Sequence, residues 1–227
     1  MPFSTHSPIP INEKLTVEEL ITKLRKRVNI NLIACAAEEK CRDKFVREAE
    51  LNRPGLALTG YLDVFSWQRV QIIGNTETDY LEKLPEDKQL EAFGNITKFD
   101  LPIIFLTNGN TLPNVLLENA TQRGIPIYTT PYETTRFMLL LKDFLDDQFA
   151  LQTMVHGAMV DVYGVGILIV GKSGIGKSEV ALDLVERGHR LVADDVVMIT
   201  KKGSVLMASA TTMSKHFMEI RGLGIVD

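Results

Sequence analysis

Eight consecutive residues in the second half of the chain have the spacing of a phosphate-binding loop. They read Gly171-Lys172-Ser173-Gly174-Ile175-Gly176-Lys177-Ser178 and match the pattern GxxxxGK[ST] at every fixed position. Glycines here let backbone N–H groups approach phosphate oxygens without interference from a Cβ atom. Lys177 is expected to reach the β- and γ-phosphates of a nucleoside triphosphate, and the Ser178 hydroxyl to ligate Mg²⁺. Residues 171–178 therefore predict a Walker A site for ATP with Mg²⁺, and we call them the Walker loop.

Two adjacent carboxylates follow the Walker loop in the sequence. Asp194 and Asp195 end the apolar run of residues 191–193. A carboxylate beside a phosphate loop often holds Mg²⁺ or orients the attacking group. Neighbouring residues of a regular strand point to opposite faces, so one carboxylate could polarise a nucleophile while the other holds metal or structure. The alternative is a solvated strand end without a catalytic duty.

Near its end the chain places two charges and two glycines inside an apolar stretch, Glu219-Ile220-Arg221-Gly222-Leu223-Gly224. Glu219 could ligate Mg²⁺, and Arg221 could bind a phosphate with two parallel hydrogen bonds. An exposed ion pair on a loop explains the same residues equally well. His156 precedes Gly157, and from its context alone it is more readily a structural histidine than a catalytic one.

The elements that must position these groups follow from the pattern around them. The sequence predicts strands over residues 159–163 and 166–170, joined by a tight turn at Gly164. A helix over residues 178–187 follows the Walker loop and ends at Gly188. A strand over residues 190–199 is interrupted by the two aspartates. The loop thus lies between a strand and a helix, as the motif requires.

The first half of the chain alternates short strands and helices. We expect strands at residues 70–73, 103–107 and 125–129, and helices at 17–28, 76–84 and 113–123, with Thr16 capping the first helix. Residues 31–36 form a further short apolar run. Such alternation predicts parallel βαβ units. The expected organisation is an α/β domain at residues 1–133, a connecting helix at 134–150, and a Walker-loop domain at 151–227.

Composition narrows the possible functions. The 227 residues are 45% hydrophobic and 24% charged, which is ordinary for a globular protein. A formal net charge of -4 argues against nucleic-acid binding. No stretch has the roughly 20 apolar residues of a membrane span, and the N-terminus does not resemble a secretory signal. Cys35 and Cys41 lack the spacing of a zinc site. We therefore expect a cytoplasmic protein without membrane or nucleic-acid contacts.

Taken together, the motifs resemble the HPr kinase/phosphorylase family. The resemblance rests on the segment from His156 to Gly164, the Walker loop with Glu179, the stretch from Arg187 to Asp195, and the Glu219 segment continuing to Ile225. It extends into the first half through Arg53-Pro54-Gly55, residues 69–77 and Thr134-Thr135-Arg136. It thus covers nearly the whole chain, and several motifs in order are more specific than the Walker loop alone.

The resemblance implies a function and an assembly. Members use ATP to phosphorylate a serine of HPr, the phosphocarrier of the sugar phosphotransferase system, and remove that phosphate with inorganic phosphate, releasing pyrophosphate. They are typically hexamers with an N-terminal α/β domain and a P-loop kinase domain resembling phosphoenolpyruvate carboxykinase.

The resemblance also implies roles for particular residues. His156 and Lys177 correspond to catalytic residues, and Ser178 and Glu219 to Mg²⁺ ligands. The aspartate pair would contain the base; Asp195 is favoured and Asp194 stays open. Arg221 would belong to the phosphate-handling loop.

Family members continue beyond the Glu219 segment, so the resemblance implies that this sequence, which ends at Asp227, is a fragment or the product of a truncated gene. Two other functions stay open at this point. One is a nucleotide-binding regulatory protein without transfer activity, and the other is a small-molecule kinase on the same nucleotide fold.

Overall fold

The structure is a computed structural model that describes residues 7–34 and 44–211, and the backbone alone of residues 218–220 and 224–226. The chain divides into two compact units. Asn12–Phe149 forms the first, here called the N-terminal unit. Met1–Ile11 and Ala150–Asp227 form the second, the C-terminal unit.

A five-stranded sheet of order β3-β8-β7-β6-β5 is the centre of the N-terminal unit. β5 (Leu51–Asn52), β6 (Val70–Ile73), β7 (Ile104–Leu106) and β8 (Ile127–Thr129) run parallel, which confirms the predicted βαβ units. β3 (Asn31–Ala34), which lies in the apolar run of residues 31–36, pairs antiparallel with β8, so the predicted parallel pairing does not extend to this strand. No crossover joins these two strands directly, and the chain connection therefore does not impose a parallel direction on β3. A small pair, β2 (Leu15–Thr16) and β4 (Phe45–Val46), accompanies the sheet.

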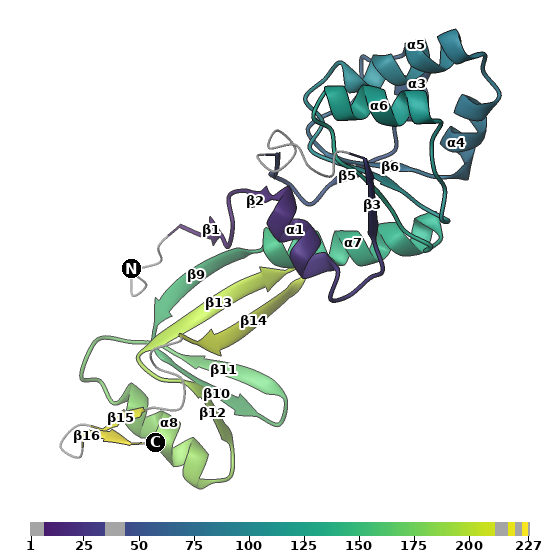
Figure 1. Cartoon of the computed structure of the whole chain (residues 1–227). Coiled ribbons are helices and arrows are strands. Elements are labelled where there is room, and N and C mark those ends of the chain that lie inside the picture. The colour runs from purple at the N-terminus through teal and green to yellow at the C-terminus, as the bar shows by residue number, and fades with distance from the viewer. Residues whose placement is uncertain (1–6, 35–43, 212–217, 221–223, 227) are drawn as a thin grey trace. The chain divides into compact units, whose positions relative to one another are not determined.

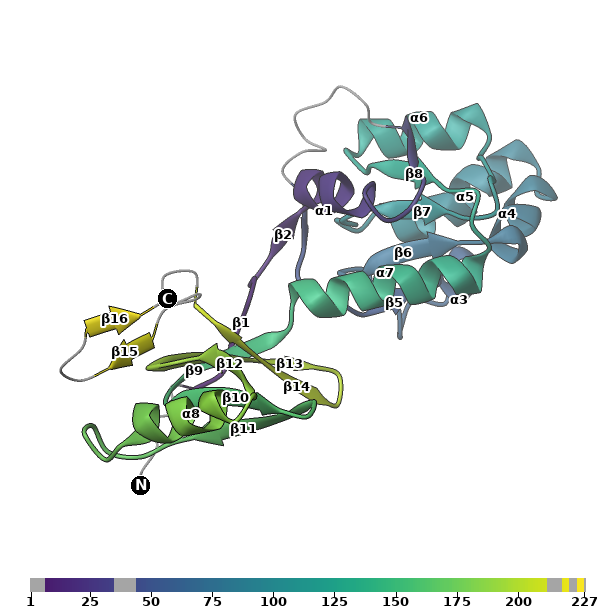
Figure 2. The same cartoon turned by 90° about the horizontal axis from the view of Figure 1, so that it is seen from below.

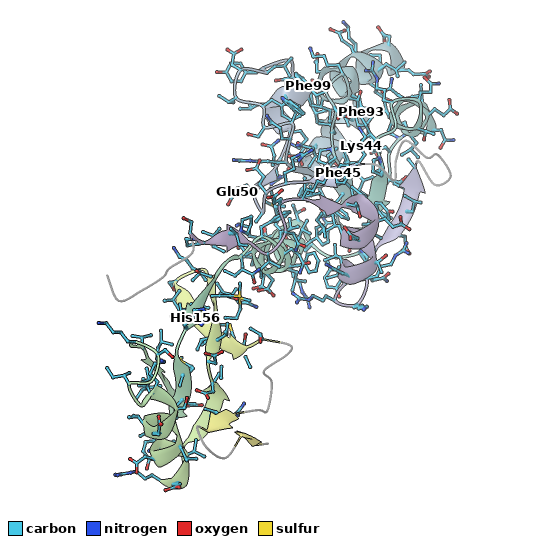
Figure 3. All side chains as sticks on the ribbon, turned by 90° about the vertical axis from the view of Figure 1, so that its left-hand side faces the viewer. Lys44, Phe45, Glu50, Phe93, Phe99 and His156 are labelled. Atoms are coloured by element: carbon cyan, nitrogen blue, oxygen red, sulfur yellow. The ribbon has the colours of Figure 1, made fainter. Side chains whose placement is uncertain are left out.

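Helices cover both faces of this sheet (Figure 1). α1 (Val17–Leu24) and α7 (Thr134–Gln148) pack on one face, and α3 (Gly55–Leu58), α4 (Asn75–Glu82), α5 (Glu86–Thr97) and α6 (Asn114–Gln122) pack on the other. Successive β6 residues supply the two cores, because Ile72 belongs to the α1–α7 side and Ile73 to the opposite side. Phe93 of α5 is fully buried in the second core (Figure 3).

The helix expected to connect the two halves belongs to the N-terminal unit. α7 buries Phe137, Leu141 and Phe144 in the same core as Ile72 and Phe105. The first described residues, in contrast, belong to the C-terminal unit, because β1 (Ile9–Pro10) pairs with β9 (Leu151–His156). The units therefore divide the chain differently from the expected limits, since burial of an amphipathic face decided where α7 belongs.

The described residues of the C-terminal unit form a four-stranded sheet, a three-stranded sheet, a short two-stranded hairpin and one helix (Figure 2). One sheet has the order β1-β9-β13-β14, with β13 at Val196–Lys202 and β14 at Val205–Ala210. The other has the order β11-β10-β12, with β10 at Ala158–Val162, β11 at Val165–Ile169 and β12 at Arg190–Ala193. α8 (Lys177–Glu186) packs on this three-stranded sheet by burying Ala181 with Ala158 and Val160. A short hairpin of β15 (Met218–Ile220) and β16 (Gly224–Val226) completes the unit.

The strands of this unit confirm one expectation from the sequence and contradict another. The hairpin turn at Gly164 is confirmed, since Tyr163 and Gly164 both have positive φ, 53° and 86°, between β10 and β11. The single strand expected over residues 190–199 is wrong: β12 and β13 lie in different sheets, and the chain changes sheet at Asp194 and Asp195. Within the described ranges, no helix has both the length and the apolar character that crossing a bilayer requires.

Candidate functional site

The register of the three-stranded sheet explains why the Walker loop and the aspartates meet. Met159 of β10 lies opposite Leu168 of β11 on one side and opposite Ala193 of β12 on the other. Both neighbours run antiparallel to β10, so both end at the same edge of the sheet. The Walker loop follows β11, and Asp194 follows β12 directly. Two segments that are separate in the sequence thus emerge side by side.

The Walker loop has the backbone conformation that its glycines allow. Gly174 and Gly176 have φ values of 78° and 97°, in the left-handed region where residues with a Cβ are strained. Gly176 is the N-cap of α8, and its carbonyl accepts the Val180 N–H at 3.0 Å. The free N–H groups of the first turn of α8 therefore face the loop, which favours an anion there. This cradle fits the phosphates of a nucleotide.

The loop lysine folds back on its own loop. The Lys177 ammonium donates to the backbone carbonyl of Lys172 at 3.2 Å. A phosphate oxygen carries negative charge and is a stronger acceptor for an ammonium group than a neutral carbonyl is. A bound nucleotide would therefore compete well for Lys177, which lies at the start of α8, within the cradle.

Asp194 is the buried member of the aspartate pair. It is 4% exposed, and its Oδ1 accepts the Ser178 hydroxyl at 3.0 Å. Hydroxyl and carboxylate oxygens are ligands that Mg²⁺ accepts. Within the described residues, no three His, Cys, Asp or Glu side chains gather closely enough to hold a metal. The donor set fits Mg²⁺ bound through one or two protein oxygens, with phosphate and water supplying the rest.

Asp195 occupies a different environment. It is exposed and has a φ of 66°, and its backbone carbonyl accepts the Gly157 N–H at 3.0 Å. The Val196 N–H donates to the Asp194 carbonyl at 2.9 Å and closes a tight turn. The pair is thus a turn between two sheets, so regular strand alternation does not describe it. The two carboxylates nevertheless differ, since one is buried and bonded and the other faces solvent.

His156 lies beside this turn. It is the last residue of β9, its side chain is exposed, and its backbone is in register with Val196. Figure 3 labels the residue in the C-terminal unit. The sheet pairing therefore places His156 next to the residue that follows Asp195, which the sequence could not indicate for a lone histidine.

The Glu219 segment is only partly visible. The backbone of Glu219 lies in β15, which packs beside α8, the helix that carries Ser178. The side chain of Glu219 and the whole of Arg221 lie outside the described residues. The structure also brings in Gly157, a residue that sequence reasoning did not select. Its available signal was its position directly after His156 and just before the strand predicted at residues 159–163.

Comparisons with known proteins agree on one family. Residues 15–145 match the family model described as HPr Serine kinase N terminus, and residues 147–227 match HPr Serine kinase C-terminal domain. The chain is similar to a protein of Chloroherpeton thalassium named HPr kinase/phosphorylase, with 54% identity over 96% of this chain and 64% of the relative. A protein of the same name from Prosthecochloris aestuarii is 51% identical over 94% of this chain and 63% of the relative.

The chain thus spans a little under two thirds of the length of these relatives. Among solved structures, the Hpr(Ser) kinase/phosphatase from Coxiella burnetii is similar at 36% identity. That match covers 33% of this chain and 49% of the other, with a TM-score of 0.32. The overlap is too small for its geometry to add to the site.

Proposed function

The chain belongs to the HPr serine kinase family, and on that premise we propose that it acts as a bifunctional enzyme on the phosphocarrier HPr. It uses ATP to phosphorylate a serine of HPr, and it removes that phosphate with inorganic phosphate. The observation that carries the proposal is the meeting of Lys177, Ser178 and the aspartate pair at one edge of the three-stranded sheet. A phosphate cradle alone would support binding, whereas a carboxylate turn beside it supports transfer.

Asp195 is the proposed general base because its carboxylate is exposed and can meet a protein substrate. In the forward direction the serine oxygen attacks the γ-phosphorus, the bond to the β–γ bridging oxygen breaks, and the serine proton passes to Asp195. In the reverse direction phosphate attacks the phosphoserine phosphorus, and pyrophosphate is released. The same carboxyl then returns a proton to the serine oxygen, as microscopic reversibility requires.

The other residues hold the phosphates and charges. Lys177 and the backbone N–H groups of the Walker loop bind the β- and γ-phosphates. Ser178 and Glu219 are the proposed Mg²⁺ ligands, with Asp194 orienting Ser178; the bound ion would neutralise charge on the phosphates. His156 and Arg221 are proposed to act on the transferred phosphate.

The proposed setting follows from the family. HPr is the protein partner, the cytoplasm is the proposed compartment, and a homo-hexamer is the proposed assembly. The relatives from which this setting is proposed are matched over a little under two thirds of their length.

The decisive experiment supplies labelled ATP and Mg²⁺ to this chain with purified HPr and then adds phosphate. We expect label on one HPr serine, followed by labelled pyrophosphate. The Lys177→Ala variant is the control and should remove both signals. Tight Mg²⁺-dependent ATP binding without transfer would instead support a nucleotide-binding regulatory protein. Label on a metabolite, with HPr unlabelled, would indicate a small-molecule kinase.

A further inference from the structure

Gly157 joins β9 to β10 and is buried. It is not among the glycines with positive φ, so conformational freedom does not explain why a glycine lies here. Gly157 contacts both parts of the candidate site. Its N–H bonds to the aspartate turn, and its lack of a side chain lets it lie against the strand that leads into the Walker loop.

The missing side chain permits a close approach to the strand that leads into the Walker loop. A Cβ on Gly157 would lie 2.5 Å from the carbonyl oxygen of Ile169 and 3.2 Å from Cγ1 of Val170. Ile169 ends β11, and the Walker loop begins two residues later at Gly171. The obstacle is a backbone atom, which cannot rotate away as the end of a side chain can. The contact therefore requires glycine at position 157.

The N–H of Gly157 binds the other part of the site, the turn at Asp194 and Asp195. It donates to the backbone carbonyl of Asp195 at 3.0 Å. Asp195 has a φ of 66°, a conformation that L-residues adopt at a cost and that needs local support. The hydrogen bond supplies that support, because it fixes the Asp195 peptide in the turn between β12 and β13.

We propose that Gly157 is a positioning residue that sets the separation between Asp195 and the Walker loop. The proposal rests on the proposed function, in which Asp195 takes the serine proton while the Walker loop holds the phosphates. One side of Gly157 lies against the strand that leads into the loop, and its N–H holds the aspartate turn. Gly157 thus links the proposed base to the phosphate loop, in addition to the Ser178–Asp194 hydrogen bond that joins the same two segments.

Replacing Gly157 by alanine should displace the aspartate turn more than the Walker loop. β11 is held by β10 in the sheet, and α8 packs on the same sheet, so the loop between them is anchored at both ends. The aspartate turn lies between two sheets. Besides the bond from Gly157, it is held by the Val196 N–H and the Ser178 hydroxyl, which both donate to Asp194 rather than to Asp195. The added methyl group would thus push position 157 and Asp195 away from Ile169.

The chain contains a matched control. Gly166 lies in β11 of the same sheet, and a Cβ there would lie 2.4 Å from Cε of Met159. That atom is the end of a flexible side chain, which can move aside. Gly166→Ala therefore adds the same methyl group near the same sheet without pressing on a backbone atom or on the aspartate turn.

The experiment compares Gly157→Ala, Gly166→Ala and the unaltered chain with Mn²⁺ and ATP bound. Mn²⁺ replaces Mg²⁺ because it enhances nuclear relaxation in a distance-dependent way. The amide of Asp195 is observed by NMR, so the separation from the Walker loop is measured without any transfer reaction. Where HPr is phosphorylated, kcat and the KM for ATP are measured as well.

We expect Gly157→Ala to change the relaxation of the Asp195 amide and Gly166→Ala to leave it unaltered. The kcat should fall about 100-fold in Gly157→Ala, because a displacement near 1 Å has that effect, while the KM for ATP changes about threefold or less. If Gly157 had only a structural role, Gly157→Ala would lower the fraction of folded protein, and it would not lower kcat selectively while leaving the KM for ATP nearly unchanged. Equal Asp195 relaxation in all three chains would overturn the proposal.

Two further outcomes are separable. If the unaltered chain binds Mn²⁺ and ATP but never phosphorylates HPr, the proposed function fails and the relaxation data still decide the position of Asp195. If Gly157→Ala does not fold, hydrogen exchange of the Gly157 amide in the unaltered chain provides the test. Slow exchange supports the bond to Asp195, and exchange at the rate of an exposed amide overturns the proposal.

Discussion

At the scale of single residues, two neighbouring aspartates have become chemically different groups. Asp194 is buried and accepts the Ser178 hydroxyl, whereas Asp195 is exposed in a left-handed turn. The difference comes from the change of sheet between them, because the chain cannot continue β12 into β13 without a turn. Environment rather than residue type therefore separates a structural carboxylate from a candidate base.

Asp195→Asn tests this separation. Asparagine also tolerates positive φ and has the same shape, so we expect the free energy of unfolding to change by about 0.5 kcal/mol or less. Loss of a general base should lower HPr phosphorylation by about 10² to 10⁴. Thermal unfolding and the initial rate of labelling measure the two effects.

Asp194→Ala should behave differently. It removes a buried carboxylate and leaves the Ser178 hydroxyl without its acceptor. We expect the C-terminal unit to lose about 1–3 kcal/mol of unfolding free energy, measured by urea denaturation. Equal destabilisation by Asp194→Ala and Asp195→Asn would contradict the assigned environments.

At the scale of elements, three loops of the N-terminal unit meet around the start of α4. Arg53, which follows β5, pairs with Glu77 of α4 at 2.8 Å, and the Glu77 carboxylate also accepts the Gly74 N–H at 3.0 Å. Thr134 at the start of α7 lies against Gly74 and bonds to Thr107 at 2.7 Å. These contacts join the ends of β5, β6 and β7 to α7.

The Arg53–Glu77 pair should stabilise the N-terminal unit only as a pair. Glu77 is 5% exposed, so Arg53→Ala leaves a buried carboxylate with only the Gly74 N–H, and we expect a loss of about 1–3 kcal/mol. Adding Glu77→Gln to Arg53→Ala should recover part of that loss. Urea denaturation of the unaltered chain, the two single variants and the double variant measures this recovery. If the free-energy losses of the two single variants simply added, the pair would not act as a unit.

The cap of α7 predicts a pH dependence. The Glu133 carboxylate accepts the N–H groups of Thr135 and Arg136, which lower its pKa. A lowered folded-state pKa stabilises the fold above the unfolded value of about 4.3 and loses that contribution as the pH falls through the folded value. Glu133→Ala should therefore lower the urea midpoint at pH 7. This effect should diminish as the pH falls below the unfolded-state pKa of about 4.3 and through the lower folded-state pKa.

Glu118→Ala is the control, because Glu118 is an exposed glutamate within α6 that caps no helix. The effect of Glu118→Ala on the urea midpoint should be small both at pH 7 and at a pH below the unfolded-state pKa of Glu133. An effect of Glu133→Ala that stays constant as the pH falls would show that its carboxylate charge does not contribute to the cap.

At the scale of the whole molecule, the two units differ in their cores. The N-terminal unit buries two extensive clusters, one on each face of its sheet. The cluster around α8 in the C-terminal unit has only Ala158, Val160 and Ala181 as buried members among the described residues. Since buried apolar area is the main source of stability, we expect the C-terminal unit to open first.

Ligand binding should act on one unit alone. ATP with Mg²⁺ binds the Walker loop in the proposed function, and a ligand at 100 times its Kd adds about 2.7 kcal/mol to the state that binds it. Amide hydrogen exchange should therefore slow in residues 150–211 and stay unchanged in residues 12–149. Equal slowing in both ranges would show that the units unfold together.

The sequence by itself determined the local features of this protein. The Walker loop is read directly, because its glycines, lysine and serine each have a chemical task at a fixed spacing. The periodicity of apolar residues predicted the limits of β6, α6, α7 and α8 to within one or two residues. Thr16 caps α1 as expected, and Glu19 reciprocates in a capping box. α5 is absent from the expected helices: the helix predicted at residues 76–84 ends before Pro85, and α5 begins directly after this proline.

Only the tertiary structure decided which distant segments meet. The antiparallel direction of β3, the place of α7 in the N-terminal unit and the change of sheet at the aspartate pair all depend on pairing partners far away in the chain. Gly157 shows the reason most clearly: its task exists only where the carbonyls of Ile169 and Asp195 approach it. Spacing along a chain encodes local chemistry, whereas the distance between two loops is fixed by sheet register and close packing.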